Sequence, residues 1–123
     1  MNVKKLTEMI KILKEDLGEA LMASDIWTVS DGRSIAAYNA QPKATALFNR
    51  ITKYLNKALD ESDYPPLEEY YTVSLADKVI ALVLPLGDYQ QGMLVDTKKI
   101  EMGLILNVTI PKLKETFKEA LSK

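Results

Sequence analysis

Residues 24–38 limit the folds open to this chain more than any other stretch of its sequence. Two short apolar runs, Ile26–Ser30 and Ser34–Tyr38, flank the dipeptide Asp31-Gly32. Asp-Gly accepts the positive φ angles of a tight hairpin turn, so the stretch predicts a β-hairpin. Segments with helical periodicity precede and follow it, and this order places the hairpin between two helices.

Three segments carry the apolar spacing of amphipathic helices. The first covers residues 3–17, where apolar side chains recur every three or four positions. The second is expected to begin at Pro42, a residue suited to the first helical position, and to run to about Leu59. The third starts at Lys99, and Pro111 falls inside its pattern. Because proline removes a backbone donor and clashes with the carbonyl four residues earlier, we expect one kinked helix there.

Three strands are predicted between the second and the last helix. Leu67–Leu75 alternates apolar and polar residues, which is typical of a strand with one wetter face. Val79–Leu84 is apolar at every position and is expected to be a central strand covered on both faces. Gln91–Asp96 follows a turn at Gly87-Asp88, and the short connections favour an antiparallel meander. The sequence thus predicts a single α-β-β-α-β-β-β-α domain over residues 1–123.

The composition argues against several kinds of active site. The chain has no cysteine and no histidine, which excludes thiolate and imidazole metal ligands, cysteine nucleophiles and a histidine general base. Its five glycines are dispersed and form no phosphate-binding loop. The acidic residues after the second helix lack the spacing of a calcium-binding loop. We therefore expect no enzyme activity, no catalytic residue, no metal ion and no cofactor.

Charge and hydropathy also limit the partners. The 16 basic and 17 acidic side chains leave a net charge of −1, so no overall field favours nucleic acid or an anionic membrane. The longest apolar stretch, which begins with Val79–Leu84, is too short to span a bilayer. The first residues are charged and carry no apolar signal-peptide core. We expect a cytoplasmic protein that does not insert into membranes.

In the order of its elements the chain resembles the Roadblock family, which is named for dynein light chains and occurs in bacteria and archaea as partners of small GTPases. The resemblance covers nearly the whole chain and is carried by short apolar motifs. These motifs are Ile26–Val29 before Asp31-Gly32, then Ser34–Ala37, the alanine-rich start of the second helix, Val79–Leu86, Leu94–Asp96 and Met102–Ile105.

The resemblance implies an α+β domain with a three-layer α/β/α Roadblock fold, similar to profilin and longin domains. Its five-stranded antiparallel sheet would have the strand order 2-1-5-4-3, with the second helix on one face and the terminal helices on the other. Val79–Leu84 would then lie inside the sheet. The two polar-faced strands, Ser34–Tyr38 and Leu67–Leu75, would form its edges.

The resemblance also implies a function. Members of the family form homodimers or heterodimers in which the third strands pair and the second helices pack across a two-fold axis. The implied protein is a non-catalytic dimerisation and scaffold module that binds and regulates a small Ras-like GTPase. Its partners would be a second copy of itself and the GTPase, and the GTPase would supply the nucleotide chemistry.

The residues offer a physical motive for such a dimer. An edge strand carries unpaired backbone groups that a second copy could satisfy. The apolar stripe of the second helix is wider than one sheet face needs. Its two parts diverge, with Leu47, Ile51 and Tyr54 on one side and Ala44, Phe48, Leu55 and Leu59 on the other. The predicted interface comprises Leu47, Ile51, Tyr54, Tyr70 and Thr72, and the alternative is that the whole stripe belongs to the core of the domain.

Two further hypotheses stay open at the level of sequence. Arg50, Lys53 and Lys57 share one flank of the second helix, where they form either a contact surface for an acidic partner or an ordinary solvated face. The alternative function is a small-molecule-sensing domain with a profilin-like sheet. A pocket lined by Trp27, Tyr38 and Met93 would support that alternative, and a closely packed core would argue against it.

Overall fold

The structure is a computed structural model, and it describes residues 2–122. Three long helical segments and five strands follow one another in the predicted order. The elements are α1 (Val3–Leu17), β1 (Leu21–Thr28), β2 (Ser34–Tyr38), α2 (Pro42–Glu61), β3 (Tyr71–Ser74), β4 (Val79–Leu86), β5 (Tyr89–Asp96), α3 (Met102–Leu104) and α4 (Ile110–Leu121). A 3-10 turn at Gly18–Ala20 joins α1 to β1, and a π-helical turn at Ile105–Thr109 joins α3 to α4.

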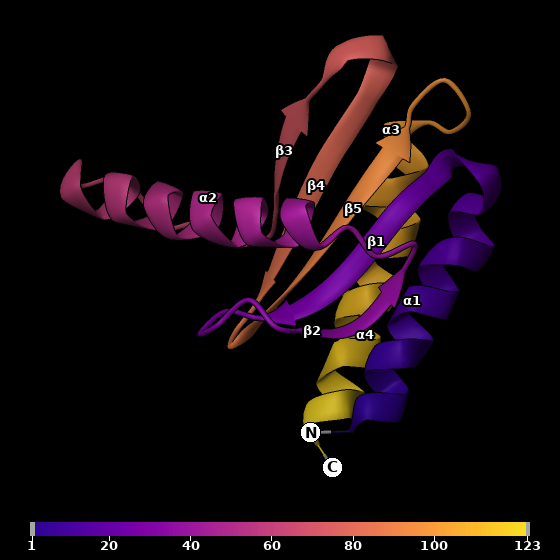
Figure 1. The fold of residues 1–123 in the computed structure, drawn as a ribbon, viewed down its shortest axis with the longest axis horizontal. Coiled ribbons are helices and arrows are strands. Elements are labelled where there is room, and N and C mark those ends of the chain that lie inside the picture. The colour runs from indigo at the N-terminus through magenta and orange to yellow at the C-terminus, as the bar shows by residue number, and fades with distance from the viewer. Residues whose placement is uncertain (1, 123) are drawn as a thin grey trace.

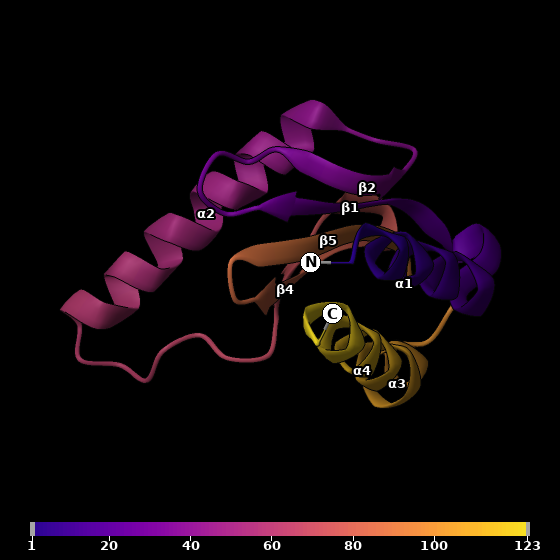
Figure 2. The ribbon, with the colours of Figure 1, turned by 90° about the horizontal axis from the view of Figure 1, so that it is seen from below.

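The five strands form one antiparallel sheet in the order β2-β1-β5-β4-β3, which confirms the predicted α+β class and strand order. Figure 1 shows α2 crossing one face of the sheet, with α1 and α4 behind the other face. The view from below in Figure 2 separates these layers, with the sheet between α2 and the pair formed by α1 and α4. The strands β2 and β3 form the two edges, as expected.

The hydrophobic core lies between the sheet and the helices α1 and α4. Helix α1 contributes Leu6, Met9 and Leu13, each fully buried, from the apolar face that its spacing predicts. Leu113 of α4 and Val95 of β5 meet them with no exposed surface. Side chains at three- and four-residue spacing therefore cover one sheet face over β1, β4 and β5, whereas the other face is covered by α2.

The first hairpin differs from its prediction in strand length and in the type of turn. Strand β1 begins at Leu21 rather than Ile26, directly after the 3-10 turn, and ends at Thr28. The turn is longer than a dipeptide, because the N–H of Gly32 donates to the carbonyl of Thr28 at 2.8 Å. Gly32 alone in this turn has a positive φ, of 68°. Asp31 instead accepts hydrogen bonds from the Thr28 hydroxyl and the Arg33 N–H, which hold the pKa of its carboxyl below the usual range.

Strand β3 is shorter than the predicted Leu67–Leu75 and covers only Tyr71–Ser74. Its register pairs Tyr71 with Val83, so a longer β3 would place Glu69 opposite Pro85. The backbone of Pro85 faces β3, since Leu86 and Tyr89 close the two-residue turn to β5 and neighbouring residues alternate in direction. Proline has no N–H to donate to an extended β3, so the ladder ends.

Pro111 is accommodated without ending the C-terminal helix. Residues Ile105–Thr109 form a π-helical turn, and the N–H of Ile110 donates to the carbonyl of Ile105. The wider turn relieves the clash between the Pro111 ring and the carbonyl of Asn107 that a regular helix would produce. The chain thus passes through Pro111 as one helical segment, with a π-helical turn that ends two residues before the proline.

Candidate interaction surface on α2 and β3

Polar side chains hold α2 on the sheet. The Thr45 hydroxyl donates to Oδ2 of Asp25 at 2.9 Å, and the Ser34 hydroxyl donates to Oδ1 of the same carboxylate at 2.6 Å. Further along α2, Asn49 accepts a hydrogen bond from Nε1 of Trp27 at 3.1 Å. All but Ser34 of these side chains are buried, so α2 docks on β1 through satisfied polar groups.

Thr52 marks the point where α2 crosses β3. Its hydroxyl lies 2.7 Å from the hydroxyl of Tyr71 and donates to the carbonyl of Phe48. Thr45, Asn49 and Thr52 are the buried residues of α2, and none follows Thr52 within the helix. Figure 1 shows why, because the second half of α2 continues past β3 and projects beyond the sheet.

The apolar stripe of α2 lies beside the buried polar face rather than on it. Phe48, Ile51, Leu55 and Leu59 are only partly buried. At 100° per residue they are displaced by about a quarter turn from Thr45, Asn49 and Thr52. The polar contacts to β1 and β3 therefore fix the rotation of the helix and leave this apolar stripe at its side.

The predicted interface residues of α2 lie at the surface. Leu47 retains 42 % of its accessible surface and Tyr54 retains 76 %. Ile51 lies between them and is partly buried. Leu47 and Tyr54 are thus exposed on the same helix that carries the half-exposed stripe.

Strand β3 presents an open backbone edge next to the projecting helix. The N–H of Leu75 donates to the carbonyl of Val79, so Leu75, Val73 and Tyr71 direct their backbone groups at β4. By alternation, the N–H and C=O groups of Thr72 point away from the sheet, and the Thr72 side chain is exposed. Tyr70 precedes the strand with 37 % of its surface accessible. Tyr70 and Thr72 therefore lie on the free edge.

Arg50, Lys53 and Lys57 lie on the flank of α2 opposite the apolar stripe. All three are exposed, and within residues 2–122 none of them takes part in a salt bridge. Helical periodicity puts them about half a turn from Ala44 and Phe48. The helix therefore separates an apolar side from a basic side.

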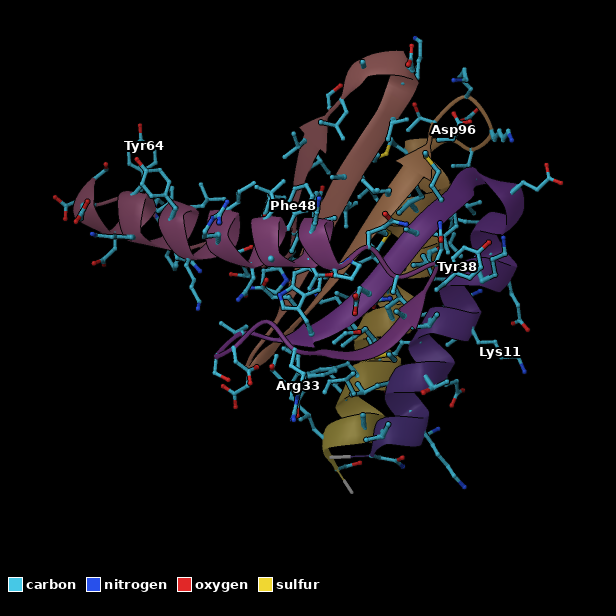
Figure 3. All side chains as sticks on the ribbon, viewed as in Figure 1. Lys11, Arg33, Tyr38, Phe48, Tyr64 and Asp96 are labelled. Atoms are coloured by element: carbon cyan, nitrogen blue, oxygen red, sulfur yellow. The ribbon has the colours of Figure 1, made fainter. Side chains whose placement is uncertain are left out.

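A small hollow opens between the first half of α2 and the sheet. Ala44 and Phe48 of α2 line one wall, and Ala81 of β4 and Leu94 of β5 lie on the sheet side. Figure 3 places Phe48 on the side of α2 that faces β3 and β4. The hollow has a volume of about 30 Å³ and is open on one side. One water molecule needs about 10–15 Å³ by the same measure, so the space suits the tip of an aliphatic side chain rather than a metabolite.

The pocket that would support a small-molecule sensor is not formed as predicted. Trp27 and Met93 border the hollow, but Tyr38 does not. Tyr38 pairs with Ser24 across β1 and β2 and lies on the opposite sheet face, where Nζ of Lys14 is 4.6 Å from the centre of its ring. Side chains alternate across a strand, so Tyr38 and Trp27 face different layers.

No group of three or more carboxylates in residues 2–122 is placed to hold a metal ion. Burial raises the pKa of Tyr71, and the hydrogen bonds that the Lys5 ammonium donates to the carboxylates of Glu119 and Glu8 raise the pKa of Lys5. Each of these shifts has a structural cause, which is burial for Tyr71 and the two neighbouring carboxylates for Lys5. No helix among these residues is long and apolar enough to cross a membrane.

The docking residues of α2 escaped the sequence analysis. Thr45, Asn49 and Thr52 recur at helical spacing, a signal that is visible in the sequence. The same spacing of polar residues also describes a solvated helix face. Only the positions of Asp25, Trp27 and Tyr71 distinguish the two cases.

No protein-family model matches the sequence, and no curated protein matches it. Solved structures match it closely in fold. MglB of Myxococcus xanthus superposes with a TM-score of 0.76 at 11% identity, covering 98% of this chain and 93% of that one. The gliding protein MglB of Thermus thermophilus gives 0.76 at 8% identity, covering 98% and 90%. A Roadblock/LC7 domain from Streptomyces avermitilis gives 0.69 at 11% identity, covering 95% and 98%. The chain therefore has the fold of MglB and Roadblock/LC7 domain proteins over nearly its whole length.

Proposed function

We propose that this chain is a non-catalytic dimerisation and scaffold module that binds and regulates a small Ras-like GTPase in the cytoplasm. The observation that carries the proposal is the position of α2, whose second half extends past β3 with an apolar stripe next to an open strand edge. In a monomer the apolar stripe of α2 and the open edge of β3 both contact water. A second copy of the same chain would cover both of them at once.

The dimer would form around a two-fold axis beside β3. Two β3 strands can pair antiparallel through the outward backbone groups of Thr72. The two α2 helices then lie antiparallel on the same face of a continuous sheet. Leu47, Ile51 and Tyr54 line the contact between the helices. Burying a fully exposed large apolar side chain contributes about 1.5–3 kcal/mol, so covering the surface that these residues still expose favours association.

The GTPase is the second partner in the proposal. Support comes from the Roadblock fold and from the division of α2 into an apolar and a basic side. If the apolar side is used between protomers, the basic side with Arg50, Lys53 and Lys57 stays outside the dimer. These cations suit an acidic patch on the GTPase and would contribute mainly to the rate and specificity of association. The GTPase would supply all groups that bind and hydrolyse the nucleotide.

Sedimentation equilibrium at micromolar concentration tests the first step. We expect a dimer, and we expect Thr72→Pro to shift it toward monomer. Thr72 has an outward N–H, so proline there removes a donor from the free edge but none from the β3–β4 ladder. Val73→Pro is the matched control, since it interrupts the ladder and lowers the stability of the monomer. A wild-type chain that stays monomeric contradicts the proposal.

Binding to a GTPase is tested with purified Ras-like GTPases of the source organism, each loaded with a non-hydrolysable GTP analogue or with GDP. We expect one of them to bind in a nucleotide-dependent manner. Arg50→Glu combined with Lys53→Glu is expected to weaken binding at low salt while the dimer persists. Absence of any nucleotide-dependent binding would remove the regulatory role and leave the dimer as a separate result.

A further inference from the structure

We propose that the hollow between α2 and the sheet is a socket for Leu59 and Leu55 of a second copy of this chain. The inference rests on the proposed dimer and specifies which side chains define its register. The hollow is lined by Ala44 and Phe48 of α2 and by Ala81 and Leu94 of the sheet. Its walls are mainly apolar, because Asp25 and Thr45 in its lining hydrogen-bond to each other, and its volume of about 30 Å³ fits side-chain tips.

The position of Thr52 sets the register. Thr52 contacts Tyr71, so this residue of α2 lies over the edge strand that would border the two-fold axis. In an antiparallel pair of helices related by that axis, a residue seven positions after Thr52 comes level with one seven positions before it. Leu59 of the second copy is therefore level with Thr45, beside Ala44. Leu55 of the second copy is level with Asn49, beside Phe48.

The rotation of α2 supplies a second argument. Leu55 and Leu59 lie on the same side of the helix as Ala44 and Phe48. A two-fold axis perpendicular to the sheet turns this side of one α2 toward the same side of the other. The overhanging leucines of one copy then face the hollow of its partner. Leu55 and Leu59 are both partly exposed in the single chain, so a second copy can bury the rest of their surface.

The sheet side of the hollow also fits an incoming helix. Figure 1 shows that α2 covers only part of its sheet face and leaves the upper ends of β4 and β5 uncovered. Leu94 in this region is partly exposed, whereas the core face of β5 is buried at Met93 and Val95. A second α2 placed there completes the layer. Each copy would thus cover the sheet of the other.

A matched pair of leucine substitutions at two alanines of α2 tests the socket by sedimentation equilibrium of the full chain. Ala44→Leu fills the hollow from within and is expected to weaken dimerisation by about tenfold or more, because the incoming leucine loses its space. Ala46→Leu adds the same side chain on the exposed opposite flank and is expected to change the dissociation constant by less than about twofold. Circular dichroism and thermal unfolding of both variants check that the monomer fold is kept.

Leu59→Ala removes the proposed occupant and is also expected to weaken the dimer by about tenfold. The double variant Ala44→Leu with Leu59→Ala is expected to dimerise no more weakly than either single variant, since a filled socket no longer needs its leucine. Additive losses in the double variant would overturn the socket.

The failure of this inference and the failure of the dimer are distinguishable. A wild-type dimer that Ala44→Leu leaves unchanged overturns the socket and keeps the dimer. A wild-type monomer overturns both. If Ala44→Leu abolishes binding of a GTPase but leaves the dimer intact, the hollow belongs to that partner instead, and the socket is again overturned.

Discussion

The indole of Trp27 lies directly on the backbone of Gly92 in the neighbouring strand β5. A Cβ atom at Gly92 would stand 2.8 Å from the nearest ring carbon. The absence of a side chain at this position lets the indole extend across β5, where its Nε1 donates to Asn49 of α2. The contact between Trp27 and Gly92 thus helps to fix where α2 sits on the sheet.

Gly92→Ala is expected to destabilise the protein by about 1–3 kcal/mol, because the added methyl group must displace the indole or the strand. Chemical denaturation with urea measures the loss. Gly103→Ala is the matched control, since its Cβ would have only the Asn107 amide nitrogen nearby, at 3.9 Å, and alanine favours the helical conformation. An unchanged stability of Gly92→Ala would show that Trp27 can shift without cost.

Asn49→Leu is expected to cost about 2–4 kcal/mol, although it adds apolar surface to a helix. The change leaves Nε1 of Trp27 and the carbonyl of Val29 without the partners that Asn49 supplies. Asn56→Leu is the control, because Asn56 is exposed two turns later on the projecting half of α2. Thermal unfolding at low protein concentration compares the two monomers, and equal stabilities would contradict the role of Asn49.

Lys78→Gly is expected to raise the stability by about 0.5–1 kcal/mol. Asp77 and Lys78 in the turn between β3 and β4 have φ angles of 63° and 62°, in the left-handed region that glycine adopts without strain. Ala76→Gly in the same turn is expected to be destabilising, since Ala76 needs no positive φ. Urea unfolding of both variants measures the sign of the change in unfolding free energy. A loss of stability in Lys78→Gly would contradict the backbone strain at Lys78.

The stability of the protein is expected to fall at alkaline pH through Tyr71. Burial raises the pKa of this phenol above its ordinary value of 10.0, while the hydrogen bond with Thr52 acts in the opposite direction. The folded protein therefore holds the proton more tightly than the unfolded chain. The corresponding stabilisation is complete below pH 10 and is lost as the pH rises through the raised pKa.

Tyr71→Phe is expected to reduce this loss when the unfolding free energy is followed above pH 10. Tyr54→Phe, at a side chain with 76 % of its surface exposed, is expected to keep the wild-type pH dependence. Equal slopes for wild type and Tyr71→Phe would contradict the assignment.

Periodicity predicted most of the fold. The apolar spacing within residues 3–17 predicted helix α1, which covers Val3–Leu17, and Pro42 marked the first residue of α2. Both signals are local, because they depend on a helical face and on the fixed φ of proline. Strand ends were less accurate: β3 begins only at Tyr71 because of Pro85, a residue of a different strand.

The surface of α2 was predicted only in part. The exposed positions of Leu47 and Tyr54 agree with their separation from the rest of the stripe. Whether they form a dimer contact stays a prediction. The partial exposure of Phe48, Leu55 and Leu59 could not be foreseen, because an apolar stripe at helical spacing usually packs on the nearest sheet.

The sequence alone determined the order of the elements and the apolar faces of α1 and the strands, since these follow from side-chain periods of 3.6 and 2 residues. The tertiary structure decided how α2 is turned and how far it extends past β3. Thr45, Asn49 and Thr52 find their partners on Asp25, Trp27 and Tyr71, which lie 20, 22 and 19 residues away in the chain. The hairpin turn between residues 28 and 33 shows both contributions. Its position follows from the local sequence, whereas its role depends on the tertiary structure. It brings β1 and β2 together so that Ser34 and Thr45 both donate hydrogen bonds to Asp25.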